Sequence, residues 1–553
     1  MGKQPDLIIT GAKVYTADPR APWAEALAVT DGVFTAVGSE ANVRAMADAA
    51  TTVVDVAGQL VLPGLIDEHI HLGLGGGQAA WELSILPSDT NAEVLAKVAE
   101  WARGLEPDAW IVGGIISSQV LDEVANTTDL AALDAAAGGR PVLLRDLSMH
   151  NRWVSSRTLE LMGVTQDTVD PSDGEYVRDA AGNLTGVLYE IACAGAETAF
   201  QHSIADPSSR NRTSLKTSLD IINSFGITAV QDGATMGYAW EALGSIEEDG
   251  ELTAWVIGSM PTRPFLEDGV VGEELYAIGA AHRTRHLRPD FLKFVLDGVP
   301  ITRTSAMLNP YVCHAGDDPE ERGETYWTLP DLIAGIEYCY DNGFNAKLHG
   351  TGNASAKLVL DAIEDVQSRR GPGPLFQLAH PEFIDPADVP RFAVLGVVPD
   401  AAPYLWYPGP ITDAIKSHVD DDLVEKSWAF RDLLDAGAIV AAGSDWPCVL
   451  TTPDPWIGLE TLVTRANVDP SVGGVLGASQ RLSVEEAVAA FTRDAAKATG
   501  LDDVTGMIRE GLSADFIVLD QNIFEIDPSH IHKTRVDATY FDGSVVYRRV
   551  EVS

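Results

Sequence analysis

Residues 61–77, VLPGLIDEHIHLGLGGG, change from a run of apolar residues to two histidines and then to a stretch rich in glycine. The apolar run suits a strand that is buried on both faces, as in a parallel sheet. Because side chains alternate along a strand, His69 and His71 would point to the same face and could reach one cation. The glycines would form a loop whose backbone can approach a ligand. We interpret this segment as the first strand of a barrel, carrying half of a metal site.

Further strand-like segments alternate with amphipathic helical segments through most of the remaining chain. Apolar residues recur at helical spacing in the intervening segments, for example in LPDLIAGIEYCYDN and SAKLVLDAIEDVQSR. This alternation is typical of βα units with parallel strands. The expected strands cover residues 226–233, 252–260, 291–298, 345–350, 375–383, 396–403 and 438–445. With the opening strand they predict a (β/α)8 TIM barrel, in which reactive groups lie at the carboxyl ends of the strands.

Both ends of the chain have a different pattern, of short strands and tight turns. LIITGAKVYT near the start and ATYFDGSVVYRRV near the end are examples. We predict a composite β-sandwich domain from residues 1–62 and 503–553, flanking a barrel over residues 63–502. Residues 78–201 mix helices with short strands and are too long for one βα loop. We predict that they form an insertion that covers the mouth of the barrel, where such loops determine selectivity.

Charge and composition narrow the class of protein. The chain of 553 residues has 81 acidic and 38 basic residues, and this excess of negative charge would repel nucleic acids and anionic membrane surfaces. No stretch approaches the roughly 18 uninterrupted apolar residues of a membrane span. The four cysteines lack the short paired spacing of a disulfide framework or a cysteine metal site. We expect an enzyme of the reducing cytoplasm that acts on a small molecule, and a homodimer is compatible with the sequence.

Metal-competent side chains lie at the ends of five expected strands. They are His69 and His71 on the first strand, Lys293 on the fourth, His349 on the fifth, His380 on the sixth and Asp445 on the eighth. Imidazole and carboxylate groups bind divalent cations directly, whereas a lysine does so only when it is uncharged or carbamylated by CO₂. Because the strand ends of a barrel meet at one face, the pattern predicts a site for one or two divalent cations, with Zn²⁺ as the expected metal. A carbamate on Lys293 could bridge two of them.

These residues suggest a hydrolytic mechanism. A divalent cation lowers the pKa of a bound water from 15.7 to about 7 and polarises the scissile carbonyl. Asp445 would orient this water, take its proton and return it to the leaving amine, while His380 would stabilise the developing oxyanion. Hydrolysis of an amide or a related C–N bond is the expected reaction.

Several of these residues also have structural explanations. A pair of histidines separated by one residue is common in unrelated chains, and Lys293 could pair with Asp297 or with another buried carboxylate. Lys347 shares a strand face with His349 and is the rival candidate for carbamylation. Asp232 and Asp297 each precede a glycine at a strand end, where a role in turn formation is the favoured explanation.

Candidate substrate contacts lie in the insertion and in the later loops. His150, in LSMHNRW, is either a substrate contact or an ordinary loop histidine. The aromatic residues expected above the barrel are Trp81, Trp153, Tyr404, Trp406, Tyr407 and Trp446. We select the following as substrate-binding residues: His150, Trp153, Trp406, Tyr407 and Trp446. They would favour an apolar or aromatic substrate, and the alternative is that the aromatic residues anchor loops on the barrel helices.

Several motifs resemble those of one enzyme family. They are PGLIDEHIH, RPVLLRDLSMHNRWVSS, LKFVLDG, LHGTGNASA, QLAHPEF and AAGSDWP. Through them the chain resembles the amidohydrolase superfamily and, within it, amidohydrolase family 3, the branch of YtcJ-like and N-substituted formamide deformylase-like proteins. The resemblance covers nearly the whole chain.

The resemblance implies roles for individual residues. The two histidines of the first strand would hold one metal, Lys293 as carboxylysine would bridge, and Asp445 would bind metal and shuttle protons. His349 and His380 would hold the second metal or face the substrate. The chain departs from the family at Asn353, where relatives usually have an acidic residue, and at GGIISSQV, where they often have a Gly-Trp-acidic stretch.

The function expected from the sequence is metal-dependent hydrolysis of a non-peptide C–N bond, in an amide or an N-substituted formamide. Hydrolysis of an ester or a carbamate on the same metal platform is the first alternative. A catalytically silent binding scaffold is the more remote one, and its expected mark is the loss of metal ligands. The sequence retains every ligand type at the strand ends.

Overall fold

The computed structural model describes residues 4–550 except 173, 265–268, 314–317, 403–404 and 449–450. At its centre lies an eight-stranded sheet in the order β21-β20-β19-β18-β17-β16-β15-β8. The strands are β8 (Leu65–Ile70), β15 (Ile227–Asp232), β16 (Trp255–Pro261), β17 (Leu287–Val295), β18 (Asn345–His349), β19 (Phe376–Ala379), β20 (Val397–Ala401) and β21 (Ala441–Ala442). Neighbouring strands pair in parallel, as buried apolar strands between helices do. The predicted (β/α)8 barrel is confirmed.

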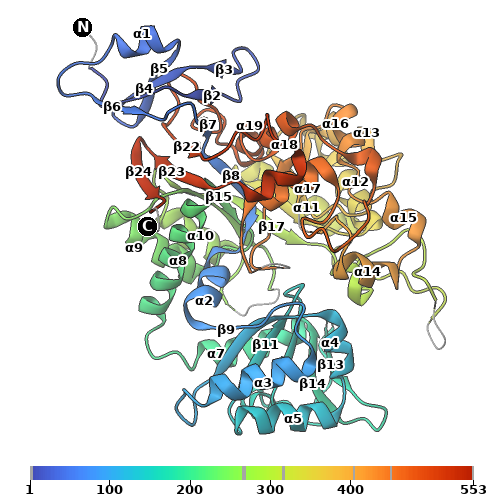
Figure 1. Ribbon diagram of the computed structural model, residues 1–553. Helices are drawn as coiled ribbons and strands as arrows, with labels where there is room; N and C mark the ends of the chain where they lie inside the picture. Colours follow the sequence, from blue (N-terminus) through green and yellow to red (C-terminus); the bar gives the residue numbers. More distant parts are fainter. Residues whose placement is uncertain are drawn as a thin grey trace.

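Helices surround the barrel strands (Figure 1). Their apolar residues recur at helical spacing, and in α12 (Asn353–Arg370) the side chains of Ala356, Val359, Leu360 and Ile363 are buried. The other helices that follow barrel strands are α8 (Pro207–Ser224), α9 (Gly237–Glu248), α10 (Glu273–Ala281), α11 (Leu329–Asn342), α13 (Val389–Leu395), α14 (Pro410–Lys416), α15 (Asp421–Glu425), α16 (Phe430–Asp435), α17 (Pro455–Thr464), α18 (Val484–Ala490) and α19 (Arg493–Thr499). Over the part of the chain that the structure describes, no helix has the length and apolar character needed to cross a membrane.

The two ends of the chain build two further sheets together. One has the order β5-β4-β1-β6 and the other the order β24-β23-β22-β7-β2-β3. In the second, β22 from the C-terminal part pairs antiparallel with β7 from the N-terminal part. The elements are β1 (Leu7–Thr10), β2 (Lys13–Tyr15), β3 (Trp23–Ala24), β4 (Ala26–Thr30), β5 (Val33–Gly38), α1 (Glu40–Arg44), β6 (Thr52–Asp55), β7 (Leu60–Pro63), β22 (Phe516–Leu519), β23 (Val536–Phe541) and β24 (Ser544–Arg548).

The segment over residues 61–77 differs from its expected structure in two ways. It contains two strands, because the chain passes from β7 in the terminal sheet to β8 in the barrel at Gly64, where a side chain would collide with Thr228. Its glycine-rich part is the helix α2 (Leu72–Trp81), and the expected loop is therefore wrong. A Cβ atom on Gly76 would collide with the backbone of α8, so glycine serves close helix packing here.

Residues between α2 and α8 form a separate lobe. Its six-stranded sheet has the order β13-β14-β12-β11-β10-β9. Its elements are β9 (Leu83–Ser84), α3 (Asn91–Ala102), β10 (Ile111–Ile116), α4 (Ser118–Glu123), α5 (Thr127–Ala137), β11 (Val142–Asp146), β12 (Asn151–Val154), α6 (Ser156–Met162), β13 (Gly174–Arg178), β14 (Leu184–Glu190) and α7 (Ala194–Gln201). This inserted lobe and the terminal sheets lie on opposite sides of the barrel (Figure 1).

Candidate metal centre

The candidate ligands lie at the carboxyl ends of the barrel strands. They are His69 in β8, His71 directly after it, Lys293 in β17, His349 at the end of β18, His380 directly after β19, and Asp445 shortly after β21. All six line one cavity of about 250 Å³. The structure therefore brings together residues that are separated by hundreds of positions in the sequence, because parallel strands of a barrel end at the same face.

His69, His71 and Asp445 form the first group that could hold a cation. His71 Nε2 lies 3.4 Å from Asp445 Oδ1, and His69 Nε2 lies 3.8 Å from the same oxygen. Each of the three residues offers one ligand atom, and these three atoms all lie within 4.8 Å of one another. Imidazole nitrogens and a carboxylate oxygen are ligands that Zn²⁺ prefers, so this group matches the donor set of a zinc site.

Asp400, at the carboxyl end of β20, is a site residue that the sequence analysis did not single out. Its Oδ2 lies 2.5 Å from Nδ1 of His69, and both side chains are fully buried. Since this bond engages Nδ1, the other ring nitrogen is left to face Asp445. Asp400 also belongs to a second group of potential ligands, with His69 and His380. The only signal in the sequence is an acidic residue inside an otherwise apolar strand.

His380 and His349 lie beside this group. The ring centroid of His380 is 4.6 Å from that of His69 and 5.1 Å from that of His349. Burial lowers the pKa of His69, His349 and His380 well below the usual value for histidine. All three are therefore neutral at pH 7, the form in which an imidazole nitrogen can donate its lone pair to a cation.

Lys293 is buried next to the first group. Its Nζ lies 3.5 Å from His69 Nε2, and it forms no ion pair with a carboxylate of the described residues. Burial, with a further contribution from the charge of Lys347, lowers its pKa to about 8. The expected structural alternative, a pair with Asp297, is not found. An appreciable fraction of Lys293 is therefore a neutral amine near pH 7 to 8.

Lys347, the rival candidate for carbamylation, is held elsewhere. Its Nζ donates hydrogen bonds to Oε1 and to the backbone oxygen of Glu68 at 2.9 and 3.0 Å, and lies 3.4 Å from Asp400 Oδ2. It does not line the cavity. These ion pairs give Lys347 a structural role within the barrel interior and leave Lys293 as the lysine at the centre.

Asp297 and Asp232 organise the backbone near the centre. Asp297 accepts hydrogen bonds from the backbone N–H groups of Ala306, Thr351 and Gly352 and from the hydroxyl of Ser355. Asp232 accepts one from the N–H of Ala234 at 3.1 Å. The hydrogen bonds of both residues agree with the explanation that these carboxylates shape loops at strand ends.

Two of the candidate ligands have strained backbones. His380 has φ 57° and Asp445 has φ 55°, in the left-handed region that residues other than glycine rarely adopt. Each such residue costs roughly 1–3 kcal/mol, and strain of this kind concentrates at functional sites. The fold therefore maintains an unfavourable backbone at the two positions that present His380 and Asp445 to the cavity.

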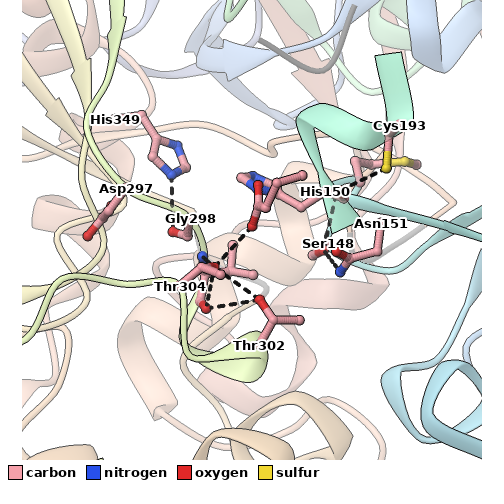
Figure 2. A network of polar contacts seen from close by, with 12 residues as sticks. Ser148, His150, Asn151, Cys193, Asp297, Gly298, Thr302, Thr304 and His349 are labelled. Atoms are coloured by element: carbon pink, nitrogen blue, oxygen red, sulfur yellow. Dashed lines mark hydrogen bonds and ion pairs between the residues drawn. The ribbon is translucent and has the colours of Figure 1, made fainter. Parts of the chain in front are cut away.

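His150 reaches the cavity from the inserted lobe, a position from which it could contact a substrate. Its Nδ1 lies 2.8 Å from Glu190 Oε2, and Thr304 of the barrel donates a hydrogen bond to Glu190 Oε1 at 3.0 Å. Figure 2 shows this junction, with His150 facing the loop of Gly298 and Thr304 below His349. Burial lowers the pKa of His150, but the charge and hydrogen bond of Glu190 outweigh this, so that the pKa is raised. His150 thus faces the cavity from the lobe, with its charged form favoured by Glu190.

The cavity has walls that are mostly apolar, but the aromatic residues on them are not the expected ones. Those on the wall are Tyr326, Trp327 and Trp428. Trp153 is buried in the core of the lobe, Trp406 packs on Trp428 and Phe430, Trp446 packs on α2 at Gly75, and Tyr407 lies outside the cavity lining. The structure does not bring these four side chains to the cavity lining, and substrate binding by them stays a prediction. Tyr404 lies outside the described residues.

Glu382 lies on the cavity wall and is a further residue that the sequence did not predict. It is 5% exposed and lines the cavity two residues after His380. Burial raises the pKa of its carboxyl to about 8. In the sequence it is one acidic residue among many, and nothing in its spacing marks it.

Comparison with known proteins identifies the family. A family model described as "Amidohydrolase family" matches residues 52–547. The chain belongs to the amidohydrolase family. It is 27% identical to an N-substituted formamide deformylase from Arthrobacter pascens, over 99% of each chain, and 26% identical to YtcJ from Bacillus subtilis strain 168, over 98% of this chain and 99% of that one. The crystal structure of an uncharacterized metal-dependent hydrolase from Pyrococcus horikoshii OT3 has a TM-score of 0.74 at 20% identity, covering 95% of this chain and 99% of the other.

The amidohydrolase family implies a divalent metal, and the residues present fit one. The imidazoles of His69, His71 and His380 converge on the carboxylate of Asp445. Nδ1 of His380 is buried without a hydrogen-bond partner among the described residues. A buried polar atom without a hydrogen-bond partner is unfavourable, so a cation or ligand bound to this cluster would give Nδ1 of His380 the partner that it lacks. Membership of the family, together with this donor set, makes the protein a metal-dependent hydrolase.

Proposed function

We propose that this hydrolase cleaves a non-peptide C–N bond, in an amide or an N-substituted formamide. The observation that carries the proposal is the convergence of His69, His71 and Asp445, whose ligand atoms lie within 4.8 Å of one another. The similarity to an N-substituted formamide deformylase over the full length supports this choice of bond.

The candidate ligands would have distinct roles, with Zn²⁺ as the proposed metal. One ion would be held by His69, His71 and Asp445, and a second, where two bind, by Lys293, His349 and His380. A bound cation supplies a water of lowered pKa and polarises a carbonyl. The carboxylate of Asp445 orients the attacking water, accepts its proton and delivers it to the leaving nitrogen. Where only one ion binds, His380 would instead stabilise the negative charge that develops on the carbonyl oxygen.

Lys293 is proposed to carry a carbamate. Its pKa of about 8 provides neutral amine, and no carboxylate of the described residues competes for it. The neutral amine attacks CO₂ and loses a proton, which leaves a carbamate with two oxygen donors. Intact-protein mass spectrometry under native conditions should find the mass of one added CO₂, which acid treatment or Lys293→Met removes.

The substrate is proposed to be a small, largely apolar molecule. The walls formed by Met149, Met236, Trp327, Leu405 and Trp428 would bury its hydrocarbon part. His150 would donate a hydrogen bond to it from the inserted lobe. The lobe would thereby take part in selectivity while the barrel supplies the reacting groups.

A substrate panel on metal-loaded protein tests the proposal. Elemental analysis should find one or two equivalents of a divalent metal, and amides or N-substituted formamides should be hydrolysed faster than matched esters and carbamates. Turnover of esters or carbamates alone would favour the first alternative. A metal-free protein in which Asp445→Asn binds small molecules as the parent does would favour a silent scaffold.

A further inference from the structure

Glu382 occupies a fixed position on the cavity wall. Its backbone N–H donates to the oxygen of His380 at 2.6 Å, and its own backbone oxygen accepts from the N–H of Trp428 at 2.9 Å. The loop after β19 is therefore tied both to the candidate ligand His380 and to an aromatic residue of the apolar wall. The position of the Glu382 side chain is thus set by the same loop that presents His380.

The carboxyl of Glu382 has no partner among the residues that the structure describes. It forms no hydrogen bond and no ion pair with them, although the residue is only 5% exposed. Glu190, which lies behind the cavity residue His150, provides the contrast, because its carboxylate accepts a hydrogen bond from Thr304 and pairs with His150. Buried carboxyl groups without partners are unfavourable. A carboxyl group of this kind beside a cavity indicates that a bound ligand forms the missing hydrogen bond.

We propose that Glu382 determines substrate specificity by accepting a hydrogen bond from an N–H donor of the substrate, an amino or amide group outside the bond that is cleaved. This inference rests on the proposed function for the identity of that bond. A carboxyl oxygen is a strong hydrogen-bond acceptor, and the neighbouring wall residues Trp428 and Leu405 offer no acceptor side chain. The substrate class is therefore an apolar amide or formamide with an additional N–H group.

A matched pair of substrates isolates this contact. N-(4-aminobenzyl)formamide and N-(4-methylbenzyl)formamide have the same scissile bond and nearly the same shape, and differ in one N–H donor. We expect the parent enzyme to prefer the amino compound in kcat/KM by about tenfold, the size of one hydrogen bond in a buried site. Glu382→Met should abolish the preference, and the isosteric Glu382→Gln, which keeps an acceptor oxygen, should retain part of it. Equal ratios in the parent and in Glu382→Met would overturn the proposal.

Binding separates a failure of this inference from a failure of the proposed function. If the parent hydrolyses neither formamide, isothermal titration with 4-aminobenzylamine and 4-methylbenzylamine tests Glu382 without turnover. The parent should bind the first amine more tightly than the second, and Glu382→Met should bind both alike. Absence of a difference in the parent would refute the role of Glu382 whatever the reaction.

Thermal unfolding provides a control on folding. Because the Glu382 carboxyl is unpartnered, Glu382→Met should unfold at the same or a higher temperature than the parent. Glu190→Gln, which disturbs a partnered carboxylate, should unfold at a lower temperature. A large loss of stability in Glu382→Met would show that the carboxyl has a structural partner, and would also overturn the proposal.

Discussion

The Nδ1 atom of His69 lies 2.5 Å from Oδ2 of Asp400, and neither side chain is exposed. A carboxylate behind a histidine fixes the ring orientation and determines which nitrogen carries the proton. In this protein it directs Nε2 of His69 toward Asp445 and Lys293. The same carboxylate lies 3.4 Å from Lys347, so the charge of Asp400 is balanced within the barrel interior.

Asp400→Asn should weaken metal binding by roughly 10- to 100-fold, because an amide holds the His69 ring less firmly than a carboxylate does. Competition with a chelator, followed by elemental analysis, measures the affinity. Circular dichroism should show an unchanged fold. Parent-like metal affinity in Asp400→Asn would mean that the bond between His69 and Asp400 has no part in preparing the site.

Asp445→Asn should keep the fold and lose catalysis. Asparagine has the same shape and tolerates the left-handed backbone that Asp445 adopts at φ 55°, so the strain does not increase. The amide is not a proton acceptor, and loss of a general base lowers kcat by about 10²- to 10⁴-fold. Steady-state kinetics at equal metal loading provide the measurement. A kcat close to that of the parent at equal metal content would remove Asp445 from the proton-transfer step.

Gly233→Ala should disrupt the centre without unfolding the barrel. A Cβ atom at this position, directly after β15, would lie 2.5 Å from Nε2 of His69 and 2.9 Å from Cε1 of His71. We expect a loss of bound metal and of activity, measured together on the purified variant. Gly473→Ala is the matched control, because a Cβ there meets no atom within 4 Å. Equal metal content in both variants would contradict the close approach.

The strand ends could be predicted from the sequence because their signals are local. His69 and His71 follow an apolar strand at alternate positions, and His349, His380 and Asp445 each end a further apolar segment. The glycine-rich segment after His71 could not be predicted, because its helix depends on the close packing of Gly76 against α8, which is a tertiary contact.

The walls of the cavity were harder to predict than the ligands. A tryptophan suits a core and a substrate pocket equally well, and only the direction in which its element faces decides between them. Trp153 therefore lies in the core of the lobe, while Trp327 and Trp428 line the cavity. Glu190 of the lobe, the partner of His150, also accepts a hydrogen bond from Thr304 of the barrel, 114 residues away in the sequence. A contact between such distant positions leaves no pattern in the sequence.

His286 should make stability depend on pH at a site remote from the metal centre. Its ring lies between Glu247 of α9 and Asp542 of the terminal sheets, at 3.0 and 2.9 Å. Burial lowers its pKa, but the hydrogen bonds and charges of Asp542 and Glu247 outweigh this, and the pKa is raised above 6.5. A raised pKa in the folded state means that protonation stabilises the fold. This contribution is complete below the pKa of histidine in the unfolded chain, about 6.5, and is lost as the pH rises through the pKa in the folded protein.

The melting temperature of the parent should therefore exceed that of His286→Gln by more at pH 5.5 than at pH 9. A difference between the two proteins that does not change with pH would show that His286 stabilises the junction by packing alone.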